Sequence, residues 1–267
     1  MSTPYWQALQ GIAGREIRRF LQQRERFVAA LVRPLVWLLV FAAGFRAALG
    51  VSITPPYTTY VTYDVYIAPG LVAMIQLFNG MQSSLSMVYD REMGGMRVLL
   101  TAPLPRWFLL FSRLFSNVLI SILQVYVFLA LARLAGIDPP ANGYVAVLPA
   151  LMLTGLMFGA LGMALSSSIH QLENFAGVMN FVIFPMLFAS SALYPLWRVQ
   201  EASDTLFYFC QINIFTHAVE LIRFALYLEP NWPALSVVTA ATTVFLLVGF
   251  WAYKPSRGML ARGPRGD

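Results

Sequence analysis

Apolar residues gather in six long segments, separated by stretches that hold most of the charges. Each segment has about 20 residues, which is enough for a helix to cross the apolar part of a bilayer. Helices also satisfy the backbone hydrogen bonds that a membrane interior leaves without water. The pattern predicts an all-α membrane protein with six transmembrane helices. The expected spans are Phe27–Phe45, Tyr66–Val88, Leu114–Ala135, Tyr144–Leu165, Phe175–Leu193 and Ala234–Tyr253.

Residues 1–26 show a helical pattern of another kind, with one apolar stripe and one basic face. Such a helix beside a membrane commonly lies in the interfacial plane, where anionic lipid attracts its charges. We therefore expect an amphipathic interfacial helix here; the plainer alternative is a basic anchor that only sets orientation. The stripe comprises Trp6, Leu9, Ala13, Ile17 and Phe20, and the polar face Arg15, Arg18, Arg19, Gln22, Glu25 and Arg26.

The composition agrees with a membrane protein, because only 11% of the 267 residues are charged and 58% are hydrophobic. A soluble domain carries about 25% charged residues. The net charge of +6 does not by itself indicate nucleic acid, since in a membrane protein the position of positive residues matters more than their sum. One cysteine, Cys210, excludes a disulfide within the chain and is expected to be a small buried residue.

Arginine and lysine fall mainly on one side of the predicted spans. That side holds 14 of the 18 positive residues, in residues 1–33, in the second connection and in a tail at 254–267. The other side keeps Arg46, Arg133, Arg198 and Arg223. The positive-inside rule therefore predicts that both termini are cytoplasmic. No cleavable signal peptide is evident, so the first span is expected to be an uncleaved anchor.

The connection between the second and third spans is unusually long and patterned. It begins with charges that must lie at or beyond the headgroups, and it then shows apolar residues at helical spacing up to a pair of prolines. Residues 89–102 are therefore expected to form a short amphipathic cytoplasmic helix whose apolar face needs a partner. The charges are Asp90, Arg91 and Glu92, the apolar positions Met93, Met96 and Leu100, and the prolines Pro103 and Pro105.

Residues 195–230, on the predicted outer side, are too polar for a clean span and too apolar for a solvated loop. Interfacial or re-entrant helices before the last span fit this composition best. Glu220 and Arg223 stand three apart, so on a helix they could pair with each other. His170 and His217 are the only histidines and lie on opposite predicted sides, which excludes a histidine pair at a metal. For His217 a hydrogen-bonded structural role is expected.

The sequence lacks both glycine-rich nucleotide-binding fingerprints, Gly-x-Gly-x-x-Gly after a strand and Gly-x-x-x-x-Gly-Lys-[Ser/Thr]. Two further classes of function stay open. An ion-coupled carrier usually places ionisable residues deep in its spans, and these spans are almost free of them. An intramembrane hydrolase would need a nucleophile and a base, for which Ser168 and His170 are the best candidates, although such small polar residues more often pack or cap helices.

Two motifs make the chain similar to the ABC-2 family of exporter permeases. Asp90-Arg91-Glu92-Met93-Gly94-Gly95-Met96-Arg97 through Leu99-Leu100-Thr101-Ala102-Pro103 resembles the acidic–Arg–Glu–x–Gly…Leu-Leu…Pro signature after the second span. The run from Asn213 through Thr216, His217 and Glu220 to Arg223 resembles an Asn-Pro-x-[Thr/Ser]-Tyr-x-x-[Asp/Glu]-x-x-Arg element, with Ile214 in place of proline and His217 in place of tyrosine.

This resemblance implies a six-span permease domain over residues 27–253, with Asp90, Arg91, Glu92, Gly94, Gly95, Arg97 and Pro103 in a coupling helix docked by a separate ABC ATP-binding subunit. ATP and Mg²⁺ would bind that partner, and this chain would bind no cofactor and would not be an enzyme. It further implies a homodimer in a bacterial inner membrane, no nucleic acid partner, and a pair of short outer helices capping the path. The motif suits the drug-export branch better than the polysaccharide branch. A scaffold that does not transport is a further alternative.

Replacing Ser168 or His170 by alanine separates the transporter from the hydrolase. We expect each variant to keep most of its transport activity, because small polar residues at a span's end usually serve packing or capping. The measurement is transport by membranes that contain each variant. Complete loss of activity in both variants would favour the hydrolase.

Overall fold

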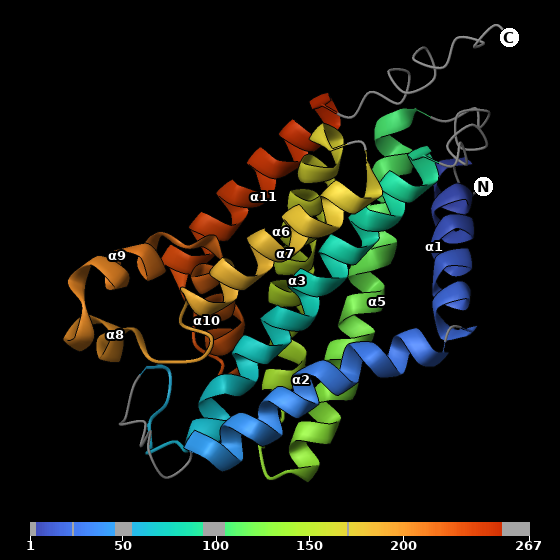
Figure 1. Ribbon diagram of the computed structural model, residues 1–267. Helices are drawn as coiled ribbons and strands as arrows, with labels where there is room; N and C mark the ends of the chain where they lie inside the picture. Colours follow the sequence, from blue (N-terminus) through green and yellow to red (C-terminus); the bar gives the residue numbers. More distant parts are fainter. Residues whose placement is uncertain (1–3, 23, 46–54, 93–104, 170, 253–267) are drawn as a thin grey trace, which may run out of the picture.

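The computed structural model describes residues 4–22, 24–45, 55–92, 105–169 and 171–252, and the regular elements in these ranges are helices (Figure 1). Their bounds are α1 Pro4–Gln22, α2 Arg24–Phe45, α3 Tyr63–Glu92, α5 Arg106–Leu134, α6 Gly143–Ser168, α7 Leu172–Phe188, α8 Leu196–Ala202, α9 Asp204–Ile212, α10 Ile214–Leu226 and α11 Trp232–Ala252. The chain is therefore an all-helical bundle over the described residues.

The six predicted spans fall on six helices: α2, α3, α5, α6, α7 and α11. Among the described helices, α5, α6 and α11 are long and apolar enough to cross a membrane, and the bent pair α9 and α10 could make a fourth crossing. The apolar parts of α2 and α7 are shorter, and α3 carries several polar residues. The all-helical class and the multi-span character are thus confirmed, and the number six stays a prediction.

Helix α6 lies at the centre, in contact with α3, α5, α10 and α11. Glycines let α3 and α6 approach closely: a Cβ on Gly80 would lie 2.7 Å from backbone atoms of Phe158, and one on Gly162 would lie 2.4 Å from Oγ of Ser84. Small residues at helix interfaces let backbones pack where the hydrophobic effect gives no preference between helix and lipid. The pair α3 and α6 is therefore expected to move as one unit.

Polar side chains in the interior of the bundle bond to one another and to backbone. The amide of Asn79 on α3 donates to the side-chain oxygen of Gln124 on α5. Gln76 donates to the carbonyl of Leu151 at 2.7 Å and accepts from the hydroxyl of Thr154 at 2.5 Å. Because a buried amide without partners is costly, these bonds fix the register of α3 against α5 and α6.

Helix α1 packs against α5 over much of its length. The ring of Tyr5 meets that of Phe108 edge-on with centroids 5.1 Å apart, and Phe20 meets Phe27 of α2 at 5.7 Å. Ala13 and Phe20 of the predicted apolar stripe are buried, whereas Trp6 is exposed. Protein thus covers part of the stripe, and the position of α1 relative to a membrane stays a prediction.

Two helix ends differ from the predicted spans. Helix α5 begins at Arg106, about two turns before the expected Leu114, with Pro105 just ahead of its first residue. A proline fits there because the first N–H groups of a helix have no intrahelical partner. Helix α7 ends at Phe188, short of the expected Leu193, and the chain turns into α8.

The outer segment contains three helices, α8, α9 and α10, rather than the expected pair.

Substituting Gly80 by alanine tests the close contact of α3 with α6. The added methyl group meets backbone rather than a flexible side chain, so we expect a loss of about 1–3 kcal/mol in unfolding free energy. Gly177→Ala on α7 is the control, since a Cβ there meets nothing within 4 Å. Thermal unfolding in detergent measures both variants, and equal midpoints would contradict the contact.

Candidate functional site

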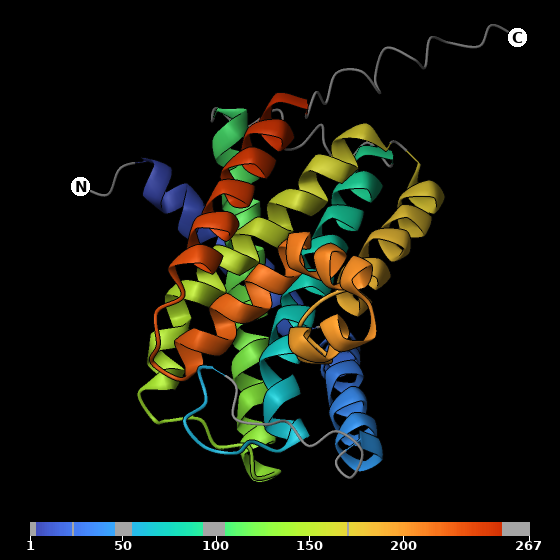
Figure 2. The ribbon, with the colours of Figure 1, turned by 90° about the vertical axis from the view of Figure 1, so that its left-hand side faces the viewer.

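Helix α3 ends and α5 begins at the end of the bundle where α1 begins and α11 ends (Figures 1 and 2). The predicted coupling segment, residues 89–102, begins in the last turn of α3. Asp90, Arg91 and Glu92 form the last turn of α3. Their side chains, and the whole of Gly94, Gly95, Arg97 and Pro103, lie outside the described residues, as does the predicted helix over residues 93–102. The roles of these residues therefore stay predictions.

Away from this end, a buried charge organises the outer segment. Arg223 on α10 is 2% exposed, and its Nη1 forms an ion pair with Oε1 of Glu220 one turn earlier. The predicted pairing of these two residues is thus confirmed. The other terminal nitrogen, Nη2, donates to the carbonyl of Ser191 at 2.8 Å. The guanidinium also lies 4.1 Å from the ring centroid of Tyr66 on α3, within reach of a cation–π attraction.

Two tyrosines of α3 donate hydrogen bonds to the same turn after α7 that accepts one from Arg223. The hydroxyl of Tyr66 donates to the carbonyl of Ser191 at 3.0 Å, and that of Tyr63 donates to the carbonyl of Leu193 at 2.5 Å. These carbonyls lie in the turn between α7 and α8. A helix continued through this turn would leave the carbonyl of Ser191 without a partner, because Pro195, four residues on, has no N–H. Side chains from α3 and α10 satisfy these carbonyls instead. We call Tyr63, Tyr66, Ser191, Glu220 and Arg223 the outer cluster.

The start of α10 explains two further residues of the motif. Asn213 caps this helix by accepting from the backbone N–H of Phe215 at 2.9 Å, and its amide donates to the carbonyls of Met186 and Ala189. Ile214 is the first residue of α10, a position that proline also favours. Thr216 donates to the carbonyl of Cys210 at 2.6 Å. The side chains of Asn213 and Thr216 thus link α10 to α7 and α9.

His217 bonds to the backbone carbonyl of Gln211 with Nε2 3.0 Å from the oxygen. This agrees with the hydrogen-bonded structural role expected for it. Over the described part of the chain, no group of three histidine, cysteine, aspartate or glutamate side chains could hold a metal ion. The arrangement around His217 is therefore one of packing and hydrogen bonding.

The tyrosines of α3 were not among the predicted site residues. Tyr57, Tyr60, Tyr63 and Tyr66 recur at a spacing of three, and this repeat was the available signal. Tyr57 is buried and meets the ring of Tyr227 edge-on at 4.7 Å, whereas Tyr60 is exposed. The hydroxyl of Tyr57 and Nε of Arg223 find no partner among the described residues. The contact between Tyr57 and Tyr227 therefore adds packing beside the hydrogen bonds of the cluster.

The outer cluster is tested by removing one charge and then both. Arg223→Leu leaves Glu220 without its partner, and we expect a loss of about 3–5 kcal/mol in unfolding free energy. The double variant with Glu220→Leu should recover part of that loss, because no charge is then stranded.

The matched control is Arg133→Leu, which breaks an ion pair with Asp138 whose side chains are 62% and 57% exposed. An exposed pair contributes at most about 1 kcal/mol, so this variant should unfold almost like the original. Chemical denaturation in detergent measures all of them. Equal losses in Arg223→Leu and Arg133→Leu would contradict the buried ion pair.

Comparison with known proteins places this geometry in a family. The family model described as ABC-2 type transporter matches residues 7–227. The transport permease ycf38 of Cyanophora paradoxa is 30% identical over 226 residues, covering 80% of this chain and 73% of the relative. Nodulation protein J of Rhizobium leguminosarum bv. trifolii is 27% identical over 216 residues, 77% of each chain. The multidrug ABC transporter permease YbhR of Escherichia coli is 26% identical over 193 residues, 70% of this chain and 52% of that one.

The match extends from α1 through α10, so it includes both the end of α3 and the outer cluster. Two of these relatives are named as permeases, which agrees with the apolar helices α5, α6 and α11. The resemblance noted from the two motifs is confirmed. The chain belongs to the ABC-2 type transporter family and is a multi-pass membrane permease of an ABC transporter.

Proposed function

We propose that this permease is the membrane subunit of an exporter, that it encloses the substrate path, and that a separate subunit binds and hydrolyses ATP. The observation that carries the proposal is the family match over residues 7–227, which includes the acidic–Arg–Glu stretch at the end of α3. Without a nucleotide-binding fingerprint in the printed sequence, ATP and Mg²⁺ are assigned to the partner. Residues 89–102 would be the surface on which that partner docks.

Helix α3 is suited to carry motion from that surface. It has 30 residues and is therefore about 45 Å long. Its Gly80 packs against the backbone of α6, and its Gln76 and Asn79 bond to α6 and α5. A displacement at Glu92 would then move α3 together with α6 instead of bending it. We propose that ATP-driven closure of the partner pushes on this end.

The opposite end of α3 meets the outer cluster. Tyr63 and Tyr66 bond to the turn after α7, and Arg223 holds α10 to the same turn. A shift of α3 along its axis would break or re-form these bonds and so move the outer helices α8, α9 and α10. We propose that these helices cap the path on the outer side and open when α3 moves.

Exposed apolar side chains on α2 and α7 offer a face that a second copy of the chain would cover. Leu39 and Val40 on α2 are 66% and 58% exposed, and Phe181 on α7 is 79% exposed. Lipid would cover such residues in a single subunit, and a partner would cover them in a dimer. We propose a homodimer that encloses the path between its two copies, with both termini on the cytoplasmic side of a bacterial inner membrane.

Purification with its ATP-binding partner separates this proposal from an ion-coupled carrier. We expect the permease to co-purify with an ATP-binding subunit and to transport only when ATP is supplied. Transport by the permease alone, driven by an ion gradient in proteoliposomes without ATP, would contradict the exporter.

Glu92→Ala tests the docking surface itself. Losing the acidic group at the end of α3 should reduce substrate-stimulated ATPase activity of the assembled complex roughly 2- to 30-fold, the range seen when a coupling residue is removed. Insertion in the membrane should be unchanged. Glu173→Ala, an exposed acidic residue in the first turn of α7, is the control and should keep full coupling. Full coupled activity in Glu92→Ala would count against a docking role for residues 89–102.

A further inference from the structure

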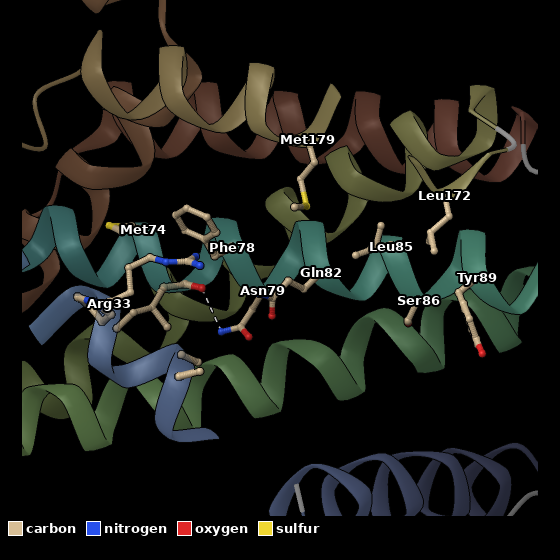
Figure 3. A pocket seen from close by; sticks show the side chains of 14 residues that line it. Arg33, Met74, Phe78, Asn79, Gln82, Leu85, Ser86, Tyr89, Leu172 and Met179 are labelled. Carbon is tan, nitrogen blue, oxygen red and sulfur yellow. Dashed lines mark hydrogen bonds between the residues drawn. The ribbon is translucent and has the colours of Figure 1, made fainter. Parts of the chain in front are cut away.

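A cavity of about 470 Å³ lies between α2, α3 and α7, separate from the outer cluster (Figure 3). Its walls are mainly apolar, with Met74 and Leu85 from α3 and Met179 from α7. The volume falls in the range of small-molecule sites, which are mostly apolar with a few placed polar groups. The cavity is therefore large enough for one small ligand.

Arg33 of α2 reaches into this cavity. Its guanidinium lies 3.9 Å from the ring centroid of Phe78, as Figure 3 shows. Phe78 stands at the middle of the 30 residues of α3, roughly 20 Å from either end at 1.5 Å per residue. Arg33 was expected among the cytoplasmic arginines, yet its charge lies halfway along the longest described helix. With α3 as a membrane span, as the sequence predicts, an ionisable group at this depth is costly and is by default a functional candidate.

Among the described residues that line the cavity, Arg33 is the one charged side chain, and none is acidic. The described residues give Arg33 an aromatic ring as partner but no carboxylate. Gln82 and Ser86 add polar groups on the α3 side, and Ser86 also accepts from Arg113 at 3.1 Å. The cavity thus has one positive group, at Arg33, and neutral polar groups further along α3, while the rest of its lining is apolar.

We propose that this cavity binds an anionic amphiphile taken from the bilayer, with its carboxylate or phosphate on Arg33 and its apolar body between α3 and α7. An anion would supply the charge that the lining lacks, in a setting where a charge-assisted hydrogen bond is strong. A cationic ligand would be repelled by Arg33, and a small hydrophilic anion would leave the apolar walls unfilled. This proposal deepens the proposed function. That the bound amphiphile is the transported substrate rests on the exporter role proposed above.

The test measures binding to the purified permease in nanodiscs of neutral phosphatidylcholine, without ATP or an ATP-binding subunit. The probes are dansylaminoundecanoic acid and its methyl ester, which share the apolar body and differ in charge. The acid should bind at least roughly tenfold more tightly than the ester, as one charge-assisted hydrogen bond allows. Arg33→Gln should remove this preference while leaving affinity for the ester unchanged, and Arg33→Lys should keep part of it.

Two further variants separate the site from general effects of charge and folding. Ala30→Trp places a bulky ring from α2 in the cavity and should weaken both probes. Arg133→Gln removes an exposed arginine on α5 and should change neither. If the acid and the ester bind alike, or if Arg33→Gln keeps the preference for the acid, the proposal is wrong.

It is equally wrong if Arg33→Gln leaves probe binding intact and changes only the mass of the solubilised complex, because the cavity then serves contact between two copies. Failure of ATP coupling is a separate result. The permease could show an Arg33-dependent preference for the acid and yet never bind an ATP-binding subunit. That result would contradict the proposed exporter function and support the binding site.

Discussion

The backbone carbonyls of the turn between α7 and α8 are the groups around which the outer half of the molecule is arranged. A mainly apolar bundle offers little water to these groups, so side chains must satisfy them. The carbonyl of Ser191 accepts hydrogen bonds from Tyr66 and Arg223, and the carbonyl of Leu193 accepts one from Tyr63. Because Arg223 also needs its own counter-charge, Glu220 is held one turn away on α10. One interrupted helix thereby determines how α3, α7 and α10 meet.

Helix α3 links this arrangement to the rest of the proposed mechanism. Its first turn carries Tyr63 and Tyr66, its middle lies beside Arg33, and its last turn ends at Glu92. The glycine contacts with α6 and the bonds of Gln76 and Asn79 keep the intervening turns in register. A push at one end would therefore be felt at the ligand cavity and at the outer helices together. In the proposed mechanism, this coupling is the physical reason why the outer helices open only when the ATP-binding partner pushes on the cytoplasmic end of α3.

Local sequence pattern predicted what depends on neighbours along the chain. Apolar runs located the six long helices, and the spacing of Glu220 and Arg223 predicted their ion pair. The turn that follows α7 escaped prediction, because its carbonyl at Ser191 is satisfied by a tyrosine 125 residues away in the chain. The extra turns of α5 escaped as well, since Phe108 is covered by Tyr5 of α1. The spacing of three between Tyr57, Tyr60, Tyr63 and Tyr66 does not say which distant segment these side chains contact. The coupling residues beyond Glu92 stay predictions.

Contact between residues 89–102 and an ATP-binding subunit can be measured by cross-linking in native membranes. A photoreactive residue at Gly95 would be compared with one at Leu228, which follows α10 at the other end of the bundle. We expect Gly95 to cross-link to a protein that carries a Gly-x-x-x-x-Gly-Lys-[Ser/Thr] sequence and Leu228 not to. Cross-links to such a subunit from Leu228 alone, or from neither position in membranes that support ATP-driven transport, would rule out docking of that subunit on residues 89–102.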